Sequence, residues 1–259
     1  MVINNKGRIA FFLCLTVLGI AGAMFARQIG QQQNNKVQEE IPQKLTEADV
    51  AELSGVFRKI DTANNLLLEG TYELYDIATD SLLETEPFIL AKYHGETYSL
   101  VGPIEQFVKG NKYVMVDNSL QAVLGKDSLE NDTSFAILKG FSEINQVIDE
   151  GAGVKVSFKD IRGNRSVKIE GDSLGTYKTS EIIFDRTTRK LKMASIVTNV
   201  TVPGNEENIE KKLLLKLVLK KYEEAPSGNE HIHLNGKLSW KGKQIQLPDS
   251  LKKYQVTYY

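Results

Sequence analysis

The sequence predicts a mainly β domain of the α+β class, with an antiparallel sheet, two amphipathic helices and a hydrophobic helix at the N-terminus. Three observations carry this prediction. Short runs of aliphatic and aromatic residues recur between Gly, Asn and Asp turns, which is typical of strands. Two other stretches have helical spacing. The connections between the first strand-like runs are too short for crossover helices, so these strands form a meander.

The composition excludes several function classes. The chain has 259 residues, enough for one domain with a sizeable core and additional segments. Its 32 Lys and Arg balance 33 Asp and Glu without a long block of one sign, so no nucleic-acid partner is expected. The single cysteine, Cys14, lies in the first hydrophobic stretch, which excludes an intrachain disulfide and a cysteine-based metal site.

The N-terminus has the features of a signal peptide and of a signal anchor. Lys6 and Arg8 precede an apolar run over residues 9–26. Ala21 and Ala23 match an A-x-A processing site, which favours cleavage. As a transmembrane helix the run would reach roughly 27 Å, near the thickness of a bilayer core, which favours retention in the inner membrane. Both alternatives place the rest of the chain outside the cytoplasm, in the periplasm.

The chain divides into four parts. Residues 1–26 are the signal anchor or signal peptide, and residues 27–44 are a Gln-rich linker with too few large apolar residues to bury a core. Residues 45–226 form the β-rich domain. Residues 227–259 form a C-terminal β extension, in which Asn235-Gly236 indicates a hairpin and "KKYQVTYY" a final alternating strand.

Two helices flank the first group of strands. In "TEADVAELSGVFRKI", Thr46 is placed to cap a helix with Asp49 at its third position. The apolar residues of this stretch recur at helical spacing. A second helix is expected over residues 134–151, with Gly151 as its stop signal. Strands are expected at "NLLLEGTYELYD", "PFILAKY", "ETYSLV", "QFV", "KYVMV", "QAVL", "GVKVSFKD", "RSVKIEG", "YKTSEIIFD" and "KLKMASIVTNV".

The stretch "KKLLLKLVLKK", residues 211–221, is compatible with a basic amphipathic helix or with a strand. As a strand it places Leu213, Leu215, Leu217 and Leu219 on one face, and lysines alternate with apolar residues on the other. As a helix its apolar arc would include Lys at both ends. The pattern therefore favours a strand whose sheet is covered on one side.

"FVKGNKYVMVDNSLQAV", residues 107–123, resembles the signature stretch of the LolA/LolB-like lipoprotein carriers. The order of elements is similar as well: an initial helix, a helix after this hairpin, and final strands such as "YKTSEIIFDRTTRKLKMASIV". The resemblance covers roughly residues 46–226. It implies a strongly curved antiparallel sheet that forms an incomplete β-barrel over two helices, with a hydrophobic cavity for acyl chains.

Catalytic and metal-binding patterns are weak. "GDSLG", residues 171–175, matches G-x-S-x-G and resembles the start of GDSL esterases, with Ser173 as nucleophile. That chemistry needs a turn into a helix, whereas the following residues are strand-like, so an esterase is the less favoured alternative. His231 and His233 would share one side of a strand, but no third ligand accompanies them at motif spacing. No enzyme activity, cofactor or metal is expected.

We therefore expect an extracytoplasmic protein that binds an acyl chain or a lipidated protein and acts in envelope lipoprotein handling. The alternative is a membrane-tethered structural or assembly component, with envelope-complex proteins as partners, no ligand, and the N-terminal helix in the membrane. The candidate cavity residues come from the one-sided apolar faces. They are Leu74, Phe88, Leu90, Leu100, Val114, Val116, Ile182, Phe184, Leu213, Leu215, Leu217 and Leu219.

Overall fold

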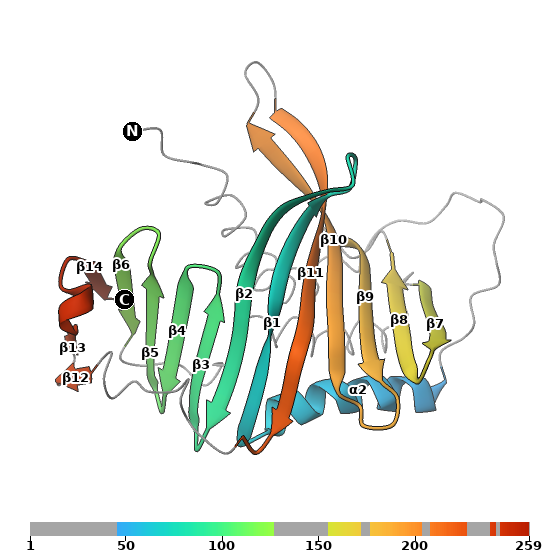
Figure 1. Cartoon of the computed structure of the whole chain (residues 1–259), viewed down its shortest axis with the longest axis horizontal. Coiled ribbons are helices and arrows are strands. Elements are labelled where there is room, and N and C mark those ends of the chain that lie inside the picture. The colour runs from blue at the N-terminus through green and yellow to red at the C-terminus, as the bar shows by residue number, and fades with distance from the viewer. Residues whose placement is uncertain are drawn as a thin grey trace, which may run out of the picture. The chain divides into compact units, whose positions relative to one another are not determined.

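The protein is mainly β in the computed structural model, which describes residues 46–126, 155–171, 177–203, 208–226, 239–241 and 244–258 (Figure 1). Its elements are α2 (Glu47–Thr62), β1 (Asn65–Asp76), β2 (Ser81–Tyr93), β3 (Glu96–Val101), β4 (Ile104–Lys109), β5 (Lys112–Asp117), β6 (Ala122–Lys126), β7 (Lys155–Ile161), β8 (Asn164–Glu170), β9 (Tyr177–Asp185), β10 (Leu191–Pro203), β11 (Asn208–Glu224), β12 (Ser239–Lys241), β13 (Gln244–Gln246), the 3-10 turn η2 (Asp249–Leu251) and β14 (Gln255–Tyr258).

The principal sheet has the strand order β14-β6-β5-β4-β3-β2-β1-β11-β10-β9-β8-β7, and β12 pairs with β13 separately. The pairings within β2–β6 and within β7–β10 are antiparallel, whereas β14 runs parallel to β6. The expected class, mainly β with a large curved antiparallel sheet, is confirmed, and the sheet is not closed into a barrel. The expected helix over residues 134–151 and the N-terminal hydrophobic helix lie outside the described residues.

The described chain forms two compact units. Unit 1 contains α2, β7–β10, residues 73–84 of the β1–β2 hairpin, and β11 up to Leu217. Unit 2 contains the remaining parts of β1, β2 and β11, together with β3–β6 and β12–β14. Strands β1, β2 and β11 each contribute residues to both units.

Helix α2 begins as its sequence predicts. The Asp49 backbone N–H donates to Thr46 Oγ1 at 3.2 Å, and the Thr46 backbone N–H donates to Asp49 Oδ2 at 3.2 Å. This reciprocal capping satisfies donors that the first helical turn leaves unpaired. The apolar stripe of the helix is buried, so this is the face by which α2 packs against the rest of unit 1. Its members are Leu53, Val56, Phe57 and Ile60, each at most 2% exposed.

Arg165 of β8 connects α2 to the strands beside it. Its guanidinium donates to Asp49 Oδ1 at 3.2 Å, to Glu52 Oε2, and to Asp160 Oδ1 at 3.0 Å. Arg186 also donates to Asp160, at 2.8 Å, and Lys59 Nζ donates to the Thr188 carbonyl at 2.9 Å. Figure 1 shows α2 crossing the same end of β8–β10. The Arg165 side chain is only 13% exposed, and its carboxylate partners compensate for the cost of partly burying its charge.

Hydrogen bonds and charge lower the pKa of two carboxyls in this network. Hydrogen bonds from Thr46, followed by the Arg165 charge, hold the pKa of Asp49 below its usual range. The hydrogen bond and charge of Arg165 hold the pKa of Asp160 low as well. A carboxyl with a lowered pKa in the folded state stabilises the fold above its unfolded-state pKa, and this stabilisation is lost as pH falls through the folded-state value.

We expect Arg165→Gln to lower the free energy of unfolding by about 1–2 kcal/mol at pH 7, because it leaves partly buried carboxylates without their cation. The difference from the parent protein should shrink as pH falls below about 4, where Asp49 and Asp160 begin to gain protons. Chemical denaturation at pH 7 and pH 3 measures it. Arg162→Gln, in the exposed β7–β8 turn, is the control. An unchanged difference at both pH values would contradict this assignment.

Candidate apolar binding faces

The lysine–leucine stretch is a strand, as its alternation predicts. It lies within β11, where Leu213, Leu215 and Leu219 are buried and Leu217 is partly buried. Lys212 and Lys220 are exposed on the opposite face, where Lys216 is partly buried. This strand therefore has one apolar face directed into the protein, and the helical alternative is excluded.

Leu74 and Leu215 lie on neighbouring strands of unit 1. The Ile77 backbone N–H donates to the Lys212 carbonyl at 3.1 Å, and Lys211 Nζ pairs with Asp76 Oδ2 at 3.3 Å. Counting three residues back along β1 and three forward along β11 from that backbone bond brings Leu74 opposite Leu215. Both leucines are 5% exposed, so this part of the candidate set forms a joined apolar patch.

Ile182 and Phe184 share the sheet face that α2 covers. Phe184 is the cross-strand partner of Arg165, and Ile182 is the partner of Val167. Because partners in antiparallel strands point to the same face, both side chains lie on the side from which Arg165 reaches α2. Both are fully buried. They belong to the core beneath α2 rather than to an open wall.

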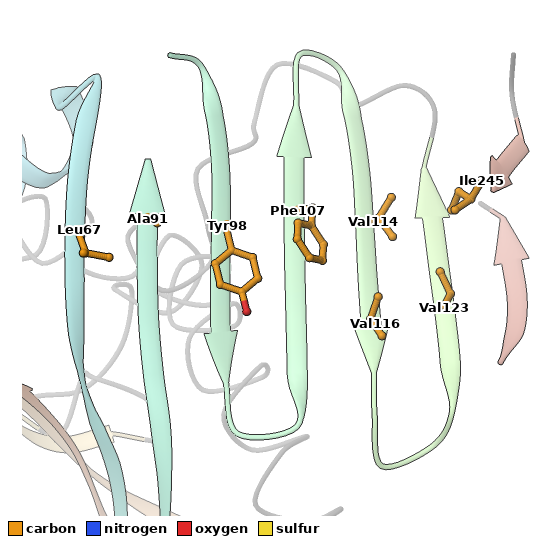
Figure 2. Close-up of a cluster of buried hydrophobic side chains, with 8 residues drawn as sticks. All are labelled: Leu67, Ala91, Tyr98, Phe107, Val114, Val116, Val123 and Ile245. Carbon is orange, nitrogen blue, oxygen red and sulfur yellow. The ribbon is translucent and has the colours of Figure 1, made fainter. Parts of the chain in front are cut away.

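Leu100, Val114 and Val116 share one face of unit 2. Val114 is paired with Phe107, which is paired with Tyr98, and Leu100 is on this face two residues after Tyr98. Figure 2 shows Tyr98, Phe107 and Val114 on three successive strands, with Val116 further along the strand of Val114. We call this surface the unit 2 apolar face. Its buried members are Leu67, Ala91, Tyr98, Phe107, Val114, Val116 and Val123, and Ile89, Tyr93 and Leu100 are partly buried beside them.

Phe88 and Leu90 point to the opposite face of the same strands. Phe88 pairs with Val101 and Leu90 with Ser99, whereas the intervening Ile89 pairs with Leu100. Phe88 and Leu90 are 3% and 2% exposed, so β2 is buried on both faces here. The candidate set thus does not form one wall in unit 2. The reason is that the run "PFILA" is apolar at every position, so its alternation does not identify a face.

The chain's own C-terminal segment covers the unit 2 apolar face. We use this name for the described residues 239–241 and 244–258. Ile245 is buried in the same cluster as Val114 and Val123, and it lies beside Val123 in Figure 2. Its Cδ1 atom would lie 2.2 Å from a Cβ built on Gly125, so β6 must carry glycine there for Ile245 to pack so closely. Other apolar side chains of this segment pack around Ile245, namely Trp240, Leu247, Leu251, Tyr254 and Val256.

Polar and cation–π contacts lie around the apolar packing between the C-terminal segment and the strands of unit 2. Tyr254 Oη donates to Asn118 Oδ1 at 3.0 Å, and Asn118 Nδ2 donates to Glu105 Oε1 at 3.2 Å. Burial, followed by the negative charge of Glu105, raises the pKa of Tyr98, whose protonated hydroxyl donates to Glu105 Oε2 at 3.2 Å. Lys112 Nζ lies 4.9 Å above the Trp240 ring, within cation–π range.

The sequence interpretation missed the role of Trp240 and Ile245. It predicted the final strand, which β14 confirms, but it treated the C-terminal segment as an addition to the domain rather than as the cover of a sheet face. The isolated tryptophan and the pattern "IQLP" were the available signals, since buried aromatic and aliphatic residues anchor such contacts.

The catalytic and metal candidates lie elsewhere. Ser173, His231 and His233, and the hairpin expected at Asn235-Gly236, lie outside the described residues. Within the part of the chain that the structure describes, no group of three His, Cys, Asp or Glu side chains is placed to hold a metal ion. In that same part, no helix has the length and apolar character needed to cross a membrane. The hydrophobic residues 9–26 are not included in it.

No protein-family model matches the sequence, and no curated protein matches it. Among solved structures, the chain is similar to a DUF1329 family protein from Desulfovibrio piger ATCC 29098, with 9% identity, a TM-score of 0.32, and coverage of 71% of this chain and 95% of that chain. It is also similar to a putative outer membrane lipoprotein-sorting protein domain from Vibrio parahaemolyticus, with 7% identity, a TM-score of 0.28, and coverage of 71% and 96%.

The second of these structures is described as a lipoprotein-sorting domain, and residues 107–123 of this chain resemble the signature stretch of lipoprotein carriers. Matches with these identities and TM-scores do not assign a ligand or partner to this chain.

We expect Gly70→Ala to destabilise the protein, because a Cβ at Gly70 would lie 2.1 Å from the Val218 carbonyl oxygen of β11. Backbone cannot move aside as a side chain does, and overpacking of this kind costs about 1–3 kcal/mol. Gly55→Ala in α2 is the matched control. Its Cβ meets only the flexible Arg189 side chain at 3.0 Å, and alanine favours a helix by about 1 kcal/mol. Chemical denaturation measures both, and equal effects would refute a close approach of β1 and β11.

Proposed function

We propose that this chain is an extracytoplasmic, non-enzymatic protein that binds an acyl chain or a lipidated protein on an apolar sheet face, in the handling of envelope lipoproteins. The observation that carries the proposal is the unit 2 apolar face, which runs across β1–β6 and against which the C-terminal segment packs. The hydrophobic N-terminal run supports the location outside the cytoplasm, either as a released protein or as one anchored in the inner membrane.

The energetics suit a hydrocarbon ligand. Burial of one methylene contributes about 0.8 kcal/mol, and a micromolar dissociation constant corresponds to about 8 kcal/mol. Roughly ten buried methylenes therefore supply this affinity before the cost of ordering the ligand is subtracted. A long acyl chain provides that number. No polar or catalytic group is required for this chemistry, and the proposal assigns none.

A second candidate function has its own support. Val114 and Val116 are each 1% exposed, and Ile245 is seated against Gly125, so the face is covered by protein in this conformation. A permanently covered face suits a structural or assembly component that binds envelope proteins and takes no lipid. The two functions differ in one measurable property, which is saturable binding of a hydrocarbon chain.

The test is displacement of a fluorescent fatty acid by an unlabelled one, with the full chain held in an amphipol. We expect saturable low-micromolar binding, weakened about tenfold or more by Leu100→Asp, because a carboxylate on the unit 2 apolar face disfavours a hydrocarbon. Leu100 is only partly buried, so this variant is chosen to preserve folding. Leu120→Asp, at a position that is 44% exposed, is the control. Absence of saturable binding would favour the structural component.

A further inference from the structure

We infer that the acyl-chain site is the unit 2 apolar face and that the C-terminal segment is its built-in occupant, which must leave before a ligand enters. This inference rests on the proposed function. It goes further because it selects one face among those available and assigns the chain a means of controlling access to it.

The unit 2 apolar face has dimensions and chemistry that suit an extended hydrocarbon. From β2 to β6 it spans four inter-strand spacings, about 19 Å in all. Ala91, Leu100 and Val116 provide small or aliphatic surface along this span, beside Glu105, whose carboxylate accepts hydrogen bonds from Tyr98 and Asn118. Among the described residues, Ile245 fills the space beside Gly125 most closely. A methylene chain can take the place of Ile245 there without leaving a polar group unpaired.

The hold on the C-terminal segment is weak compared with the hold on α2. Ile245 is its single buried hydrophobic side chain among the described residues, whereas α2 buries four. The β12–β13 pair has three residue pairs. Strand β14 adds four pairs to β6 in parallel orientation, which is slightly less stable per residue than antiparallel pairing. Elements with few buried contacts open at lower free energy than the core strands.

The polar contacts of the segment exchange easily with water. Tyr254 donates to Asn118 at an exposed position, and the Gln255 backbone N–H donates to the Gln121 carbonyl at 2.9 Å. Such bonds contribute little net free energy, because water replaces each partner. The segment is therefore held mainly by apolar packing around Ile245, and this is the interaction that a hydrocarbon ligand reproduces.

A reversible lock tests the inference. A Cβ at position 125 lies 3.2 Å from Ile245 Cγ1, so the Cβ atoms of the double variant Gly125→Cys, Ile245→Cys come within disulfide range. In a full chain that also carries Cys14→Ser, we expect the oxidised form to lose at least tenfold in affinity for the fluorescent fatty acid, and reduction to restore it. Equal affinity of the oxidised and reduced forms would overturn the inference.

The complementary variant opens the cover. Ile245→Asp places a charge against the unit 2 apolar face and should expel the segment, so fatty-acid affinity should rise several-fold while thermal stability falls. Gly70→Ala is the matched control, because it destabilises unit 2 at the β1–β11 contact without touching the segment. A stability loss in both variants with no gain of affinity in Ile245→Asp would show that residues 239–258 are permanent core.

The outcomes separate this inference from the proposed function. One outcome is that the parent chain binds the fatty acid and that neither the disulfide nor Ile245→Asp changes its affinity. This outcome would support the proposed function and contradict the inference that the C-terminal segment occupies the site. Absence of binding in the parent, in the reduced double variant and in Ile245→Asp refutes both. Hydrogen exchange gives an independent check: amides of β14 should exchange faster than those of β3–β5, and addition of fatty acid should speed exchange in β14 further. Equal protection of β14 and β4 would contradict an opening segment.

Discussion

An antiparallel sheet with one apolar face requires a cover, and this requirement organises both units of the protein. Most strands place apolar side chains on one side by alternation, although β2 is apolar on both, and exposure of an apolar face to water would cost about 25 cal/mol per Å². In unit 1, α2 provides the cover. In unit 2 the cover is the C-terminal segment. It lies at the C-terminal end of the described chain, whereas α2 lies at the N-terminal end.

The two covers are held by different interactions. Helix α2 is fixed by four buried side chains and by Arg165, whose guanidinium reaches carboxylates on both the helix and β7. Removal of the helix would leave Arg165 without two of its partners. The C-terminal segment has one deeply seated side chain, Ile245, and a rim of hydrogen bonds that water can replace. The first cover suits a permanent core, whereas the second suits a face whose occupant can change.

The strands were predictable because their signals are local. The ends of β1, β3 and β9 coincide with the expected segments, and Thr46 caps α2 as its sequence predicts. The cover of unit 2 was not predictable in this way, because the packing of Ile245 against Gly125 joins residues far apart in the chain. The face of each candidate was also uncertain where alternation fails, as Phe88 and Leu90 show by pointing away from Leu100.

A site that carries its own occupant binds ligand more weakly than the bare face would. The apparent dissociation constant is the intrinsic constant divided by the open fraction, so a segment that is open about 1% of the time weakens binding about 100-fold. That cost can serve a purpose in a protein that handles lipids. A bare apolar face of this size would bind other apolar surfaces or aggregate, whereas a tethered occupant protects it at an effective concentration in the millimolar range. In the function proposed above, a ligand with enough buried methylenes overcomes the occupant and a short one does not, so the cover would also select for chain length.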